Sequence, residues 1–408
     1  PLAVTAMAAC TALGILGVLP SKAVYAGMSN STVVLFGGMF VIGAAMFKTG
    51  LAEAIGVAVV KKAGTNEIPL MAAIMTVTII LSAVSSNTGT VACLMPVIIG
   101  ICTVAKLPAS KQLMPLAIAA NVGGTITMIG TPPNVIVTGA LTTAGLPTFG
   151  FFEFAWIGIP LSLVITIYTL FIGRHMIAAK SAGAMDEEAI KAAKEEAGAS
   201  DDDAPKSKTK MWISGLILIG VVLCMALDLK TVPLHTAAVT GAILCVVTGC
   251  LKEKEAYAGI DWVTIFLFAG MLSVASAMEK TGAGKLIADT VVSMMGTNPN
   301  PYVLTAVLFL ISNVLTQFMS NTASAALLAP IGISIAQNIG CDPKPVLMAL
   351  GIAASCAFAT PMATPPNTLV LGPGGFSFND YAKVGVPMCV ISLIVCLVVI
   401  PIVWPFGM

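Results

Sequence analysis

The chain has 408 residues, of which 57% are hydrophobic and only 10% are charged, and its formal net charge is +1. Soluble domains carry about 25% charged residues, so this composition indicates a membrane protein that crosses the bilayer several times. A near-neutral chain without a basic, aromatic-interleaved patch gives no sign of a nucleic-acid partner, and the single arginine, Arg174, excludes a guanidinium cluster for phosphate.

Apolar stretches long enough to cross about 30 Å of hydrocarbon recur along the chain, and none has the alternating period of a barrel strand. We therefore predict an all-α polytopic membrane protein. Shorter or glycine-rich pieces are expected to be hairpin arms, interfacial helices or half-helices; they lie at 51–63, 88–105, 132–144, 283–296, 322–340 and 367–375. Candidate spans lie at 2–20, 31–47, 68–86, 112–129, 152–173, 212–228, 232–251, 261–278, 301–319, 345–360 and 382–405.

These elements divide the chain into four parts. Residues 1–30 are expected to form an N-terminal transmembrane helix, 31–173 a first repeat, 174–210 a hydrophilic linker and 211–408 a second repeat. The linker carries seven of the twenty lysines and arginines, which predicts that it is cytoplasmic and that the protein lies in the inner (plasma) membrane. Because the chain begins at Pro1, we expect the start of the protein to lie upstream.

One pair of short motifs occurs twice in strongly apolar surroundings. Ser86-Asn87-Thr88 is followed by Thr131-Pro132-Pro133-Asn134, and Ser320-Asn321-Thr322 by Thr364-Pro365-Pro366-Asn367. The asparagine-to-threonine spacing is 44 residues in the first copy and 43 in the second. Irregular backbone at membrane depth persists only where it is buried or lines a cavity. A duplicated helix break of this kind indicates the substrate site of a secondary transporter.

A third marker supports an internal duplication. Met39–Gly50 matches Met271–Gly282 at six of twelve positions with an offset of 232 residues, close to the offsets of 234 and 233 between the motif copies. With about five crossings in each repeat, an odd number, the repeats are expected to be inverted. The predicted hairpins lie at 82–105 and 316–340, and the predicted broken helices at 112–144 and 345–375.

The doubled motif combines groups that bind anions and cations. Free N–H groups at a helix N-terminus carry about half a positive charge and bind carboxylates, while carbonyl and hydroxyl oxygens suit a hard cation such as sodium. The proline pairs end the preceding helix. Thr131 and Thr364 then offer hydroxyls, Asn134 and Asn367 are expected to cap the next half-helix, and Gly123-Gly124 permits close approach before the first break.

On these motif pairs the chain resembles the divalent anion/sodium symporter family, whose members carry succinate, malate, citrate or sulfate. The resemblance implies one site built from both tips and both breaks, a homodimer, and an elevator motion in which the hairpins and broken helices cross the membrane with their cargo. Carried over by motif, the residues that would contact substrate carboxylates are Ser86, Asn87, Thr88, Thr131, Ser320, Asn321, Thr322, Thr364 and Pro365.

The same resemblance implies a sodium ion on each side of the anion, with no other cofactor. Ser82 and Thr316 each lie five residues before their motif asparagine, so the two ion sites would keep one pattern. The first ion would take oxygens from Ser82, Ser86, Asn87 and Gly130, and the second from Thr316, Met319, Asn321 and Ala363, with Met319 and Ala363 contributing mainly backbone carbonyls.

The charge pattern favours cation coupling. The basic residues nearest to the hairpins and breaks, Lys106, Lys111 and Lys344, stand at segment ends. A dianion at the bilayer centre needs positive charge, and a sodium-independent exchanger would be expected to supply a basic residue there. We predict sodium-coupled symport of a C4-dicarboxylate such as succinate or malate. A sodium-independent exchanger for citrate or other di- and tricarboxylates and a sulfate symporter remain the alternatives.

Three other classes fit less well. A sodium/proton antiporter or an arsenite carrier of the wider superfamily would need a buried titratable group, but Glu53, Asp228, Asp261, Glu279 and Asp289 fall at segment ends or in amphipathic pieces. A channel would need rings of charges or carbonyls. No enzyme is predicted, because the sequence has no metal-ligand spacing and no nucleophile motif, and its ten cysteines lack a Cys-x-x-Cys pair.

Overall fold

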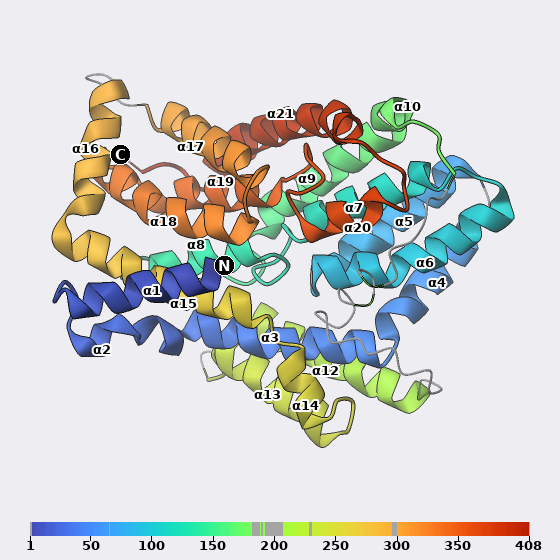
Figure 1. Ribbon diagram of the computed structural model, residues 1–408, viewed down its shortest axis with the longest axis horizontal. Coiled ribbons are helices and arrows are strands. Elements are labelled where there is room, and N and C mark those ends of the chain that lie inside the picture. The colour runs from blue at the N-terminus through green and yellow to red at the C-terminus, as the bar shows by residue number, and fades with distance from the viewer. Residues whose placement is uncertain are drawn as a thin grey trace.

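The computed structural model describes residues 2–64, 66–181, 188, 191, 207–227, 231–295 and 300–407, and its regular elements there are all helical (Figure 1). Most of the predicted linker and Asp228 lie outside the described residues. Six described helices are long and apolar enough to cross a membrane, in agreement with a multi-pass protein: Ser31–Lys48, Asn87–Ala105, Ala155–Met176, Lys208–Ala226, Trp262–Thr281 and Phe378–Val403.

The helices form two layers, which Figure 1 shows in its lower and upper parts. The lower one, here called the support layer, contains α1 (Leu2–Ile15), α2 (Ser21–Val24), η1 (Ala26–Ser29), α3 (Ser31–Lys48), α12 (Lys208–Ala226), α13 (Leu234–Val247), α14 (Glu253–Ala258) and α15 (Trp262–Thr281). Within it α13 packs along α3 and α1 packs along α15.

The upper part, here called the hairpin layer, contains the doubled motifs. Its first half comprises α5 (Glu67–Ser82), α6 (Asn87–Ala105), α7 (Ser110–Gly123), α8 (Pro132–Thr143) and α9 (Ala155–Tyr168), which continues through η2 (Thr169–Gly173) into α10 (Arg174–Met176). Its second half comprises α17 (Pro301–Thr316), α18 (Asn321–Asn338), α19 (Pro343–Ser355), α20 (Pro365–Leu371) and α21 (Phe378–Val403).

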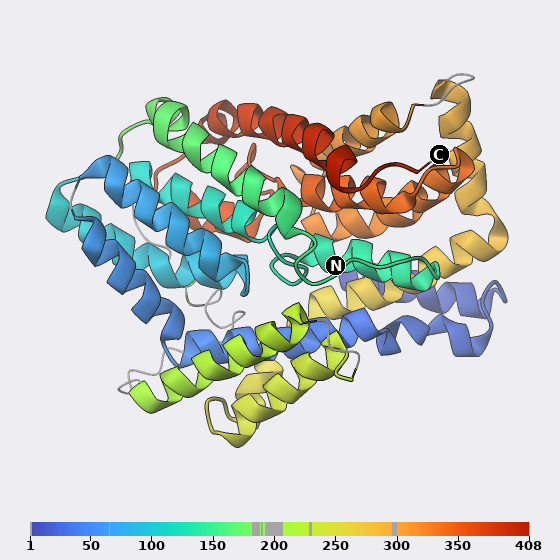
Figure 2. The same cartoon turned by 180° about the vertical axis from the view of Figure 1, so that it is seen from behind.

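Two amphipathic helices, α4 (Leu51–Ala63) and α16 (Ala283–Met295), connect the layers at opposite ends of the molecule (Figures 1 and 2). Each follows a glycine in the left-handed region, Gly50 (φ 80°) and Gly282 (φ 74°). A residue with a side chain adopts this conformation only at a cost, so glycine lets the chain turn sharply out of α3 and α15. The duplicated Lys-Thr-Gly sequence therefore marks the point at which the chain leaves the support layer in each half.

The N-terminal region differs from the single transmembrane helix predicted over 1–30. α1 has 14 residues, ends at Ile15 and is followed by Gly17, which has φ 71°. At 1.5 Å per residue it spans about 21 Å, less than the hydrocarbon thickness. α13 also has 14 residues and ends before a left-handed glycine, Gly249, with φ 71°. α1 is thus the counterpart of α13 in the first half rather than an additional span.

The hairpins are longer than the predicted ranges, which cover each tip and its second arm. α5 supplies the first arm before 82–105, and α17 supplies it before 316–340. The piece 88–105 lies in α6, the second arm of the first hairpin, which has 19 residues and by its length and composition could cross a membrane. Its start at Asn87, directly after the break at Ser86, gives it this length.

α7 and α19 form the centre of the hairpin layer. Every residue of α7 is buried except Lys111, and every residue of α19 is buried except Lys344. These two lysines are 233 positions apart, the offset of the Thr-Pro-Pro-Asn motifs. The matching burial indicates that the two halves pack around equivalent central helices.

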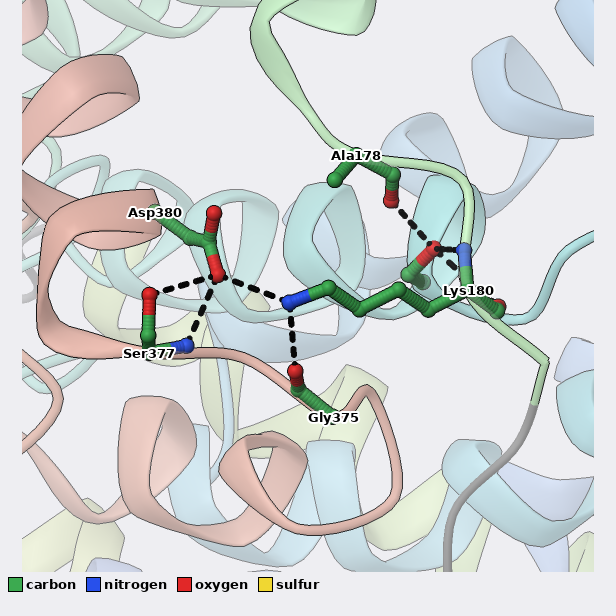
Figure 3. A network of polar contacts seen from close by, with 6 residues as sticks. Ala178, Lys180, Gly375, Ser377 and Asp380 are labelled. Carbon is green, nitrogen blue, oxygen red and sulfur yellow. Dashed lines mark hydrogen bonds and ion pairs between the residues drawn. The ribbon is translucent and has the colours of Figure 1, made fainter.

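α9 and α21 lie side by side in opposite directions and are fastened at both ends. At one end Lys180 Nζ lies 3.0 Å from Asp380 Oδ2 and donates to the Gly375 carbonyl at 2.6 Å (Figure 3). At the other end Lys344 Nζ lies 2.7 Å from Glu153 Oε1, which also accepts from Trp404 Nε1 at 2.5 Å. Both acids also accept the N–H of the residue three positions earlier, at 2.8 and 2.7 Å, so the two ion pairs are equivalent clasps.

Candidate functional site

A cavity of about 860 Å³ lies between the support layer and the hairpin layer. α3 and the start of α15 line it on one side, and both Ser-Asn-Thr tips and both Thr-Pro-Pro breaks line it on the other. The structure thereby brings together residues that are 234 positions apart. The predicted site residues that line it are Ser86, Asn87, Thr88, Gly130, Thr131, Met319, Ser320, Asn321, Thr322, Ala363, Thr364 and Pro365.

Each hairpin tip ends where a serine begins the second arm. Ser86 is the N-cap of α6 and its hydroxyl accepts from the Gly89 N–H at 3.3 Å. Ser320 is the N-cap of α18 and accepts from the Ala323 N–H at 3.4 Å. The positive ends of both helix dipoles therefore meet the cavity, and free N–H groups of the first turn are available to an anion.

Ser82 does not line the cavity but lies directly behind the first tip, with an exposed fraction of 0%. Its hydroxyl oxygen lies 2.5 Å from the terminal atom of the Asn87 side-chain amide that points towards it, and 2.7 Å from the Ala120 carbonyl oxygen. The same end of the amide lies 3.1 Å from the Gly130 carbonyl oxygen and 3.3 Å from that of Ala120. One hydroxyl, one amide and two carbonyls thus converge at this point.

The second tip repeats the arrangement. Thr316, also 0% exposed, places its hydroxyl 2.6 Å from Asn321 Oδ1 and 2.8 Å from the Ala354 carbonyl oxygen. A hydroxyl has one hydrogen and cannot donate to both acceptors at once. Acceptor oxygens at such short distances repel one another when too few hydrogens lie between them. This repulsion is relieved when an amide N–H₂ turns towards them or when a cation lies among them. These residues therefore fit a monovalent cation that takes oxygen ligands.

Charge in the cavity wall is sparse. Among the described residues that line it, Asp261 is the one charged side chain, and none is a lysine, arginine or histidine. Asp261 is the N-cap of α15, where its carboxylate accepts from the Thr264 N–H at 3.0 Å and from the Thr264 hydroxyl. The sequence placed this acid at a segment end, which is correct, but gave no reason to expect it in the cavity.

The asparagines of the Thr-Pro-Pro-Asn motifs do not cap the half-helices, contrary to the prediction. Thr131 and Thr364 occupy the N-cap positions of α8 and α20. Asn367 Nδ2 instead donates to the carbonyls of Ala357 and Thr360 at 2.9 Å each, and Asn134 makes the equivalent bonds at 3.2 and 2.9 Å. Each asparagine thus ties its own break together, because the two prolines ahead of it move the cap position to threonine.

Glycines permit the close packing at the first break. A Cβ on Gly124 would lie 2.9 Å from Asn87 Oδ1 and 2.9 Å from the Gly130 carbonyl oxygen. The prediction that the Gly123-Gly124 pair allows close approach agrees with this geometry. The equivalent position in the second half is Ala357, so the second break accommodates a methyl group there.

Three contributors were not found from the sequence. The Ala120 and Ala354 carbonyls carry no side-chain signal. Asn121, which lines the cavity at 1% exposure, offered a signal that was missed: an amide inside an otherwise apolar membrane helix must have a polar partner.

A helical membrane protein with a cavity between two layers, lined by two pairs of interrupted helices, has the architecture of a secondary transporter. Residues 1–344 and 318–406 match the citrate transporter family, CitMHS, and the chain belongs to that family of transporters, which are not enzymes. This confirms the resemblance to the divalent anion/sodium symporters of the ion transporter superfamily.

Among the relatives, the uncharacterized transporter YfbS of Escherichia coli (strain K12) is 25% identical over 577 residues, covering 97% of this chain and 94% of the relative. The sodium-dependent dicarboxylate transporter SdcS of Staphylococcus saprophyticus is 25% identical over 430 residues, covering 98% and 82%. The crystal structure of the Alcanivorax borkumensis YdaH transporter superposes with a TM-score of 0.69 at 15% identity, covering 100% and 98%, and supports the fold.

Proposed function

We propose that this chain is a sodium-coupled symporter of a small divalent anion, with a C4-dicarboxylate such as succinate or malate as its substrate. The observation that carries the proposal is the cavity itself. Two helix N-termini and two oxygen clusters meet there without a basic side chain. Helix N-termini attract carboxylates, and the missing positive charge must then arrive with the substrate.

Sodium and substrate are coupled through the motif asparagines. Without an ion, the Asn87 amide satisfies its surroundings by turning its N–H₂ group towards Ser82, Ala120 and Gly130. A sodium ion among these oxygens requires the opposite rotation, with Oδ1 as a ligand. The N–H₂ group then faces away from the ion and is free to donate to a substrate carboxylate. Ion binding thereby creates a donor for the anion.

The proposed ion ligands are those that the family resemblance implies, and the two clusters contain Ser82, Asn87 and Gly130 of the first set and Thr316 and Asn321 of the second. Ser82, Ser86, Asn87 and Gly130 hold the first sodium, and Thr316, Met319, Asn321 and Ala363 hold the second. The dicarboxylate lies between them against Thr88, Thr131, Ser320, Thr322, Thr364 and Pro365. Citrate is the competing candidate substrate, because the matching family is described as citrate transporters. The negative charge of Asp261 in the cavity wall disfavours a trianion such as citrate more than a dianion.

We further propose that 31–173 and 211–408 form inverted repeats, extended at the start of the chain by α1 as the mate of α13. The repeated helix order and the placement of α4 and α16 at opposite ends support this reading. The hairpin layer is the moving body of an elevator, and the support layer stays fixed in a homodimer. The membrane is the inner (plasma) membrane, and the linker 174–210 lies on its cytoplasmic side.

The test is uptake of labelled succinate into proteoliposomes under an inward sodium gradient, with choline replacing sodium as the control. Two coupled ions and a tenfold gradient support about hundredfold accumulation. Unlabelled malate should compete strongly, and citrate and sulfate weakly. Asn87→Ala and Asn321→Ala should each abolish uptake while the protein stays folded. Equal uptake in choline, or wild-type rates in both variants, would refute the proposal.

A further inference from the structure

The two breaks are equivalent in most of their contacts but differ at one buried side chain. Asn121, in α7 of the first half, donates through Nδ2 to Thr364 Oγ1 at 3.2 Å and to Asn367 Oδ1 at 3.0 Å, both in the second half. The Ala120 and Ala354 carbonyls occupy equivalent places in the two clusters, so the counterpart of Asn121 is Ser355, whose hydroxyl donates to the Gly351 carbonyl of its own helix at 2.9 Å.

This difference gives the Thr364 hydroxyl a side-chain donor that orients it, while the Thr131 hydroxyl has no such donor among the described residues. Thr364 accepts from Asn121, so its own hydrogen is left to donate towards the cavity that it lines. Thr131 lines the same cavity, but within the described part of the chain no side chain donates to its hydroxyl. The Thr364 hydroxyl is fixed as a donor before substrate arrives, whereas the Thr131 hydroxyl must be ordered on binding.

The same contact completes the second break. The Asn367 amide donates to two loop carbonyls and accepts from Asn121, so all of its groups that face protein are satisfied. At the first break the Asn134 amide makes the equivalent donations, but its Oδ1 is buried without a partner. The second break is therefore the better ordered of the two, and Asn121 is the reason.

We propose that Asn121 is a positioning residue which makes the two carboxylate subsites unequal. The subsite of Ser320-Asn321-Thr322 with Thr364 is preorganised and anchors one carboxylate of the substrate, and the subsite with Thr131 accepts the other end less selectively. This inference rests on the proposed function, since it assumes that an anion occupies this cavity. Preorganised donors bind more tightly because less freedom is lost on binding.

Asn121→Asp keeps the shape and replaces the N–H₂ donor by an acceptor, and Asn121→Leu removes the donor without adding a charge to the cavity wall, so both are measured and both should weaken anion binding. Thr364 would then donate to the new carboxylate instead of to the substrate. We expect the half-saturating anion concentration to rise about tenfold or more, as for loss of a hydrogen bond to a charged group. Ser355→Ala is the matched control at the equivalent position, and it should leave anion affinity within about twofold of wild type.

The measurement is thermal stabilisation of the purified full chain by succinate, citrate and sulfate in sodium, followed by sodium titration. Sodium is titrated in the absence of anion, because coupling is reciprocal. A structural defect would weaken sodium and anion together, whereas a positioning role weakens the anion alone. Thr364→Val should also weaken anion binding, and adding the uncharged Asn121→Leu to it should cause little further loss.

The outcomes separate the two proposals. If no anion stabilises the wild type, the proposed function and this inference both fail. If the wild type responds and Asn121→Asp responds equally well, only this inference is overturned. Fully additive effects of Thr364→Val and Asn121→Leu would likewise overturn it, because Asn121 would then not act through Thr364.

Discussion

At the scale of single residues, the first oxygen cluster, the proposed site of one sodium ion, depends on the absence of one methyl group. Gly124 faces Asn87 and the Gly130 carbonyl at distances where a Cβ would sit at 2.9 Å from both. Real Cβ atoms do not approach so closely, so Gly124→Ala must push the Asn87 amide away from its oxygen partners. The second cluster has Ala357 at the equivalent place and does not depend on glycine.

We therefore expect Gly124→Ala to raise the half-saturating sodium concentration of uptake by about tenfold, as for overpacking of a closed site. Ala357→Gly is the matched control and should change this concentration by less than about twofold. Sodium titration of succinate uptake in proteoliposomes measures both. A Gly124→Ala protein with wild-type sodium dependence would show that this cluster is not an ion site.

Sequence reasoning at this scale succeeded where polar residues lie in apolar surroundings. Ser86, Asn87, Asn321 and Thr364 had to be buried against partners or line a cavity, and they line one. It failed for backbone carbonyls, which every residue has, and for the motif asparagines Asn134 and Asn367. Their role depends on how a loop of several residues folds back, which local capping rules do not determine.

At the scale of helices, the two clasps across α9 and α21 differ in their burial. The side chains of Lys344 and Glu153 are 18% and 20% exposed, whereas Lys180 is 37% exposed beside Asp380 at 14% (Figure 3). Water screens the more exposed pair and weakens it. Lys344 also lies 5.3 Å from the centre of the Phe149 ring, a contact that adds to its pairing.

Lys344→Met is therefore expected to lower stability by about 2 kcal/mol, because Glu153 keeps its charge in a partly enclosed place and loses a charged donor. Lys180→Met should cost less than about 1 kcal/mol, as for an exposed pair. Melting temperatures of the detergent-solubilised variants measure the difference. The argument fails if Lys180→Met is the more destabilising of the two.

Helix boundaries could be predicted wherever proline or glycine marks them. Pro132 and Pro365 open α8 and α20, a few residues before the starts that capping by Asn134 and Asn367 would give, and Gly50 and Gly282 end the marker segments. The N-terminal region was misread because Gly17 interrupts a run that remains apolar on both sides. Hydropathy does not separate one long span from a short helix followed by a turn.

At the scale of the whole molecule, the duplication was visible in the sequence but the layer partners were not. Three markers at nearly constant offset defined two halves, and the helix order repeats accordingly. That α13 packs on α3 and α1 on α15 could not be predicted. Lipid tails are as apolar as the side chains of these helices, so hydrophobicity alone does not select one neighbour over another.

The charge balance of the loaded site sets the response to membrane potential. In the function proposed above, two oxygen clusters hold two sodium ions and the substrate carries two negative charges, while no basic side chain among the described residues lines the cavity. The two sodium ions and the dianion together therefore have no net charge when the hairpin layer carries them. A voltage acts on net charge only, at about 2.3 kcal/mol per charge per 100 mV.

Succinate accumulation should consequently be the same at zero potential and at an inside-negative potential of about 100 mV imposed by potassium and valinomycin. A third coupled sodium would carry one net charge and increase accumulation about fiftyfold under the same potential. The sodium gradient is held constant between the two conditions, so only the voltage differs. Stimulation of that size would mean that a cation site exists beyond the two clusters at Asn87 and Asn321.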